Sequence, residues 1–119
     1  MFNPDPRDTQ YFSINEVYEW CKKDGPMGNP IASKRTIRYW SSIGVLPKPT
    51  RFGREMCYRG DVFFKILTVK MLTGILGHPL HEVALLMLHN RHLSAYEYYQ
   101  STLWYSYDWL TKSPASFRK

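Results

Sequence analysis

The chain has 119 residues, of which 44% are hydrophobic, 16% are aromatic and 22% are charged, and its net charge at pH 7 is +6. This length suits one domain with a single core and is too short for two ordinary domains. The most apolar stretch, residues 62–76, is shorter than a membrane span, and the start of the chain lacks a signal-peptide pattern, so we expect a soluble cytoplasmic protein with no membrane partner.

The first predicted helix follows a disordered lead-in over residues 1–10. Ser13 and Glu16 are three residues apart and form a capping box at its start. Its apolar positions are Ile14, Val17, Tyr18 and Cys21. The helix should end before Asp24, because residues 25–30 contain two glycines and two prolines and predict a loop.

Ser33 is expected to cap a second helix. The spacing predicts one buried stripe on this helix, formed by Thr36, Ile37, Trp40 and Ile43. Trp40 is assigned to the core, whereas Tyr39 fits the core and the surface equally well. Gly44 occupies the position of a C-terminal stop, and residues 45–47 should leave the helix as an extended, partly buried segment.

A two-stranded ribbon is predicted over residues 48–58, with its turn near Phe52 and Gly53. Asp61 should start a third helix that stops at residues 74–77. Pro79 should begin a fourth helix with Val83, Leu86 and Met87 facing inward and Leu85 as a further inward candidate. Two helices joined by a turn and followed by a ribbon predict a mainly α, winged helix-turn-helix fold.

Aromatic residues recur at three- and four-residue spacing near the end of the chain and predict a helix over about 94–110. An aromatic seam of this kind favours burial. It can fold back on its own domain, pair with the same helix of a second subunit or stack on nucleobases. The candidate residues for a homodimer contact through this seam are Tyr96, Tyr99, Leu103, Trp104, Tyr107 and Leu110. Residues 113–119 should be disordered.

Positive charge is concentrated in the middle of the chain. Residues 31–60 contain seven of the 16 Lys and Arg but only one of the 10 acidic residues, Glu55, so the remaining residues carry nine charges of each sign. Such a cluster is typical of a surface that binds a polyanion, and nucleic acid is the commonest polyanion. A solvated surface that only keeps the protein soluble would carry the same charge.

Several runs of residues resemble the DNA-binding domain of the mercury-resistance regulator (MerR) family. They are Tyr11–Ile14, Ser33–Trp40, Ile43–Pro47, Tyr58–Val62 and Leu76–Val83. The resemblance covers about residues 11–88, and Thr-Ile-Arg-Tyr-Trp followed by Gly-Val-Leu-Pro is its specific part. It implies a winged helix-turn-helix domain that binds duplex DNA as a two-fold dimer. The expected organisation is a lead-in (1–10), a DNA-binding domain (11–90), a dimerisation or packing helix (91–112) and a tail (113–119).

The chain departs from the family pattern in three places. Its turn over residues 22–32 is several residues longer, and Glu55 and Met56 stand where the family's ribbon has Tyr-Arg. The long dimerisation helix and the ligand-sensing region of the regulators are also missing. A sensor of metal, drug or oxidant is therefore not expected.

The resemblance and the charges together give each candidate a role. Lys34 and Arg35, in the first turn of the second helix, should reach base edges in the major groove. Arg38 and Tyr39 suit phosphate oxygens, and the ribbon arginines should contact the flanking backbone. The full set of DNA-binding candidates is Ser33, Lys34, Arg35, Thr36, Arg38, Tyr39, Lys48, Arg51, Arg54, Tyr58 and Arg59.

Three functions remain open. The first is a small transcription regulator, with RNA polymerase as a further partner. The second is an architectural factor of a mobile element, such as an excisionase or a phage or plasmid maintenance protein, with a recombinase or replication protein as its partner. The third is a protein-interaction module that uses the aromatic helix.

Neither enzymatic activity nor a cofactor is expected. The chain carries no Gly-rich phosphate loop, nucleophile elbow or HExxH motif. Cys21 and Cys57 have no metal-ligand spacing and are interpreted as reduced packing residues. Two histidine pairs, His78 with His81 and His89 with His92, lack the further ligands that a metal site requires.

Overall fold

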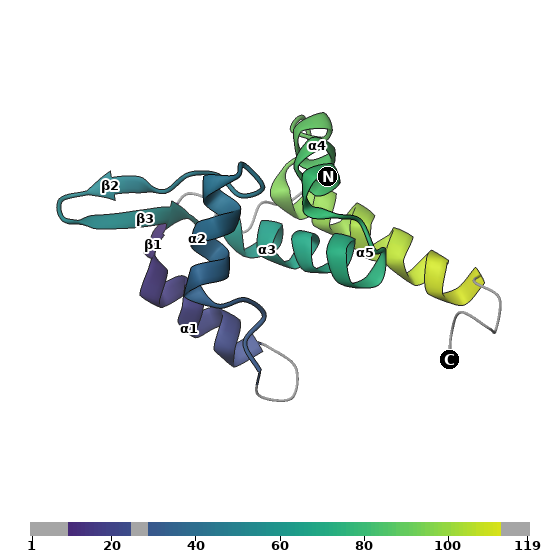
Figure 1. The fold of residues 1–119 in the computed structure, drawn as a ribbon, viewed down its shortest axis with the longest axis horizontal. Coiled ribbons are helices and arrows are strands. Elements are labelled where there is room, and N and C mark those ends of the chain that lie inside the picture. Colours follow the sequence, from purple (N-terminus) through teal and green to yellow (C-terminus); the bar gives the residue numbers. More distant parts are fainter. Residues whose placement is uncertain (1–9, 25–28, 113–119) are drawn as a thin grey trace.

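The computed structural model describes residues 10–24 and 29–112 (Figure 1). In these residues it is mainly helical with a small antiparallel sheet, as predicted. The predicted lead-in up to residue 9, the loop at 25–28 and the tail at 113–119 lie outside the described residues. The elements are β1 (Tyr11–Ser13), α1 (Ile14–Asp24), α2 (Lys34–Ser42), β2 (Thr50–Phe52), β3 (Glu55–Arg59), α3 (Val62–Lys70), a π-helical turn (Met71–Ile75), α4 (Leu80–His89) and α5 (Ala95–Lys112).

The sheet has three strands in the order β1-β3-β2, so the prediction of a two-stranded ribbon was incomplete. β2 and β3 form the expected hairpin, in which Phe52 pairs with Glu55 and Gly53 has a φ of 61°. β1 adds to the other edge of β3, with Tyr11 opposite Arg59. A three-residue strand is too short to show the alternation that identifies strands in a sequence.

Local side-chain caps start the first two helices where the sequence predicts. The Ser13 and Glu16 capping box joins β1 to α1: the Ser13 amide donates to Glu16 Oε1 at 2.9 Å, and the Glu16 amide donates to Ser13 Oγ at 3.2 Å. Ser33 Oγ accepts from the Thr36 amide at 3.1 Å and caps α2.

The end of α2 is fixed by Gly44, whose φ of 85° is a left-handed conformation that favours glycine. The chain turns back there, and the amides of Val45 and Leu46 both donate to the Trp40 carbonyl, at 2.9 and 3.1 Å. Val45 and Leu46 are each only 2% exposed. The segment after α2, predicted to be partly buried, is therefore part of the core.

One hydrophobic core joins α1, α2, β3, α3 and α4. Ile37 and Trp40 supply the α2 contribution, which confirms the core assignment of Trp40, whereas Tyr39 is 53% exposed. Ile43 was wrongly placed in the buried stripe: it follows the last helical residue of α2 and is 40% exposed. The stripe ends one turn early because the helix ends there.

α3 and α4 are connected by the π-helical turn and a bend at Gly77, where φ is 74°. Val83 is fully buried, and Leu86 and Met87 pack against the core as predicted. Leu85 is 62% exposed, so its inward assignment was wrong. It lies two positions from Val83, about 200° around the helix, and therefore faces away from the core. Along the described ranges of the chain, no helix has the length and apolarity needed to cross a membrane.

α5 begins at a second capping box, in which the Glu97 amide donates to Ser94 Oγ at 3.1 Å. The helix packs on α3 and on the π-helical turn. Its most buried residues are small, with Ala95, Thr102 and Ser106 at most 9% exposed. The Ser106 hydroxyl is satisfied within the helix, where it donates to the Thr102 carbonyl at 2.8 Å. The rings of Tyr96 and Tyr99 also meet α3, where both pack against Phe64.

Cys21 and Cys57 are buried thiols that form no disulfide, which leads to a testable expectation. Burial raises the pKa of the Cys57 thiol, and the nearby Glu55 and Glu16 carboxylates raise it further. Because the thiolate is the reactive form, a Cys21→Ala variant should react with a chromogenic disulfide reagent at least about tenfold more slowly when folded than in denaturant. Equal rates in the two conditions would contradict the burial of Cys57.

Candidate functional site

The outward side of α2 carries a row of exposed polar and basic residues. Arg35, Arg38 and Tyr39 are all exposed. Around the helix, Arg35 and Tyr39 lie about 160° from Ile37, and Arg38 lies about 100° from it. Ile37 is fully buried and fixes the rotation of the helix about its axis. The buried stripe therefore determines that Arg35 and Arg38 face solvent.

Lys34, at the first position of α2, is held by the neighbouring helix. Its ammonium lies 5.5 Å from the centre of the Tyr18 ring of α1, a cation–π contact, and its side chain is half-buried. This partner was not foreseen from the sequence, where Tyr18 was assigned to the helix's own apolar positions. Lys34 is therefore less free to move than Arg35.

Ser33 and Thr36 have structural partners of their own. The Ser33 hydroxyl donates to Thr36 Oγ1 at 2.9 Å while it accepts from the Thr36 amide. Both hydroxyls are consequently engaged in starting α2. Their main effect is to set where the basic helix begins.

The β2–β3 hairpin projects from one end of the molecule, beside α2 (Figure 1). Arg51 and Arg54 are exposed near its turn. The Tyr11 ring packs on the Phe52 ring at a centroid distance of 4.8 Å, which ties β1 to the far strand of the sheet. The third strand thus stiffens the hairpin that carries these arginines.

A groove of about 740 Å³ lies between the start of α1, the last turns of α2 and the hairpin. It brings together three of the predicted basic residues, Arg38 of α2, Lys48 of the connecting segment and Arg54 of the hairpin turn. Lys34, Arg35, Arg51 and Arg59 do not line it. The groove also has polar residues that sequence reasoning missed: Ser13, Asn15, Ser41 and Ser42.

Two DNA-binding candidates on β3, Tyr58 and Arg59, differ in their exposure to solvent. Tyr58 is 3% exposed and belongs to the hydrophobic core, with an edge on the groove. Arg59 is exposed on the same strand, opposite Tyr11 of β1. Alternation along the strand explains the difference, since neighbouring side chains point to opposite faces.

Four arginines of this surface keep their charge uncompensated within the part of the chain that the structure describes. Among the described residues, Arg35, Arg38, Arg51 and Arg54 form no ion pair with an acidic side chain. Among the described residues that line the groove, Glu55 is the only acid. The surface formed by α2, the groove and the hairpin, which we call the basic face, therefore keeps a local excess of positive charge available to an anionic partner.

Elsewhere in the described ranges, no three His, Cys, Asp or Glu side chains gather as a metal ion would require. His78 instead lies 3.2 Å from the Glu82 carboxylate, an i,i+4 contact at the start of α4. The other three histidines are exposed.

Comparison with known proteins adds no relative: no family model, no curated protein and no solved structure matches the chain.

Proposed function

We propose that the chain binds double-stranded DNA through the basic face, as a small winged helix-turn-helix protein of the MerR type. The observation that carries this proposal is the convergence of Arg38, Lys48 and Arg54 on one groove between a helix and a hairpin. A helix of α2's diameter fits the major groove of B-DNA. The hairpin beside it is placed to reach the adjacent backbone.

In this arrangement α2 enters the major groove with its first turn leading. Arg35 is the exposed donor in that turn and would pair with guanine, whose O6 and N7 accept a bidentate contact. Lys34 would contribute from its position over Tyr18.

Arg38 and Tyr39 lie one turn further along, where donors meet phosphate oxygens. The phosphate strand would pass along the groove, with Lys48 and Arg54 on its other side. Such contacts give affinity and register, and the base contacts of the first turn give sequence preference.

α5 supplies a surface for a second copy of the chain. Tyr96 and Tyr99 pack against Phe64 of the same chain, with ring centroids 5.1 and 5.3 Å apart, so they contribute mainly to the fold. Leu103, Trp104 and Tyr107 remain 42–67% exposed, and the Trp104 and Tyr107 rings stack on each other at 6.2 Å. The side chain of Leu110 lies outside the described residues. Residues 98–107 contain no charged side chain, which lets two copies of a basic protein approach each other there.

Replacing Trp104 with Glu should therefore weaken self-association. A buried Trp at an interface is commonly a hot spot, so we expect the dimer dissociation constant to rise at least about 30-fold in sedimentation equilibrium. Leu85→Glu is the matched control, because Leu85 is as exposed as Trp104 but lies on α4. If both variants associate as the unmodified chain does, α5 is not the dimer contact.

Selection from a pool of random duplexes tests the function and separates its alternatives. An enriched inverted repeat would support a dimeric regulator. Enriched direct repeats bound cooperatively would favour an architectural factor of a mobile element. The absence of any duplex binding would contradict the proposal and leave the exposed aromatic surface of α5 as the basis for a protein-interaction module.

A further inference from the structure

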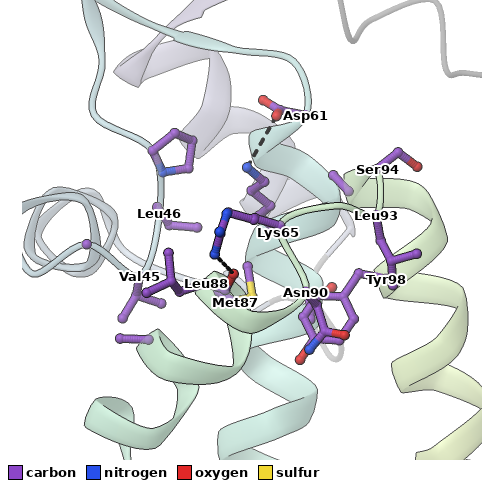
Figure 2. Close-up of a pocket in the computed structure, with 16 residues that line it drawn as sticks. Val45, Leu46, Asp61, Lys65, Met87, Leu88, Asn90, Leu93, Ser94 and Tyr98 are labelled. Carbon is purple, nitrogen blue, oxygen red and sulfur yellow. Dashed lines mark hydrogen bonds and ion pairs between the residues drawn. The ribbon is translucent and has the colours of Figure 1, made fainter.

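A second cleft, of about 380 Å³, lies away from the basic face. Its walls come from the segment after α2, the first turns of α3, the end of α4 and the connection to α5 (Figure 2). Leu46, Met87 and Leu88 line one side, and Tyr98 closes the other. None of the predicted DNA-binding residues lines it, so it is a separate site. Its volume falls in the range of sites for small organic molecules, and its walls combine apolar side chains with charged and polar ones.

The cleft has an unbalanced set of charges. Two cations, Lys65 and Arg91, and one carboxylate, Asp61, line it. Lys65 Nζ lies 3.4 Å from Asp61 Oδ2, whereas the Arg91 guanidinium donates to the Leu88 carbonyl at 3.2 Å. The lining therefore carries a net charge of +1, which a single negative charge would neutralise.

Asp61 fixes which cation is available to a ligand. Its Oδ1 is buried and has no hydrogen-bond donor among the described residues. The ion pair with Lys65 is thus the main interaction that offsets the cost of burying the Asp61 carboxylate, and it holds the Lys65 ammonium beside Asp61. Arg91 is exposed, and among the described residues its guanidinium bonds only to the Leu88 backbone carbonyl, so its remaining N–H donors can turn to an incoming carboxylate.

We propose that this cleft binds a small organic monocarboxylate with an apolar body. The carboxylate contacts Arg91 with Lys65 nearby, a charge-assisted arrangement that planar guanidinium groups favour. The apolar body packs between Leu46 and Leu88. A neutral molecule of the same shape would leave the positive charge uncompensated.

The cleft is connected mechanically to the basic face. The Leu46 amide donates to the Trp40 carbonyl, which ties this wall to the last turn of α2. Asp61 is two residues after the end of β3, the central strand of the sheet. Occupancy of the cleft should therefore shift α2 relative to the hairpin and change duplex affinity by at least about fivefold, a consequence that rests on the proposed function.

The binding step is tested on the full chain by amide chemical shifts. Benzoate and indole-3-acetate are titrated against benzamide and indole-3-acetamide, which keep the shape but lack the charge. We expect saturable shifts around residues 45–47 and 88–93, with the acids binding at least about tenfold more tightly than the amides. Arg91→Gln should abolish that difference, and Arg38→Gln, the same change on the basic face, should leave it intact. No saturable shifts, equal binding of acid and amide, or no effect of Arg91→Gln would overturn the proposal.

The coupling is tested separately by duplex affinity with and without saturating indole-3-acetate. A change in duplex affinity on adding indole-3-acetate supports the coupling if the Arg91→Gln variant does not show it. Duplex affinity that stays the same although the acid is bound overturns the coupling. If the acids bind but no duplex does, the DNA-binding proposal fails while the carboxylate site stands. If duplexes bind but the acids do not, only the carboxylate site fails.

Discussion

Replacing Arg35 and Arg38 together with alanine should reduce duplex DNA affinity more than about a hundredfold, because a bidentate base contact contributes about 1–3 kcal/mol and each lost phosphate contact weakens binding further. Both side chains are exposed on α2, so the fold should persist. Fluorescence anisotropy with a labelled duplex measures the affinity, and circular dichroism checks the helix content.

Lys23→Ala combined with Lys70→Ala is the matched control. It removes two positive charges from exposed residues in the last turns of α1 and α3, outside the basic face. We expect this control to weaken duplex binding less than about tenfold, through net charge alone. Equal losses in the two double variants would mean that binding depends on total charge and not on the basic face.

Trp40→Ala should lower the free energy of unfolding by about 3–5 kcal/mol, the usual cost of truncating a buried Trp. Trp40 is 6% exposed and belongs to the core, and its carbonyl accepts the two amides that end α2. Since small domains have only about 5–15 kcal/mol in total, much of the variant should be unfolded at moderate temperature. Denaturant unfolding followed by circular dichroism measures the loss.

Tyr39→Ala provides the neighbouring control, because Tyr39 is 53% exposed. Its stability should change by less than about 1 kcal/mol, while its duplex affinity should fall if the phenol contacts phosphate. The two adjacent substitutions thus separate folding from binding. A Tyr39→Ala variant as unstable as Trp40→Ala would contradict the orientation of α2.

The elements with strong local signals were predictable. Ser13 with Glu16 and Ser33 mark helix starts because their side chains satisfy backbone amides, and Gly44 marks a helix end because its backbone is left-handed. The hairpin turn followed from Gly53. Each of these features depends on a few neighbouring residues, which is why the sequence alone reveals them.

Features that depend on distant contacts were not predictable. β1 exists because its three residues pair with β3, more than 40 residues later in the chain. The aromatic stripe of α5 is divided in the structure: Tyr96 and Tyr99 pack on Phe64 of α3, whereas Leu103, Trp104 and Tyr107 remain exposed. Spacing identified the helix correctly and could not show which of its faces would meet α3.

The candidate site was foreseen in its residue types and only partly in its geometry. The charge cluster identified the arginines of the basic face, and the period of α2 indicated which of them are exposed. The sequence did not predict the groove, because Arg38, Lys48 and Arg54 come together only where the hairpin packs beside α2. Tyr58 illustrates the same limit: its burial follows from the position of β3 over the core.

The salt dependence of duplex affinity tests the central proposal most directly. If four to six cations of the basic face contact phosphates, the logarithm of the association constant should fall against the logarithm of salt concentration with a slope of roughly −4 to −5. The Arg35 and Arg38 double variant should have a shallower slope, and the Lys23 and Lys70 control should keep the slope of the unmodified chain. Affinity that does not depend on salt, or no measurable binding at low salt, would contradict the assignment of this surface to DNA.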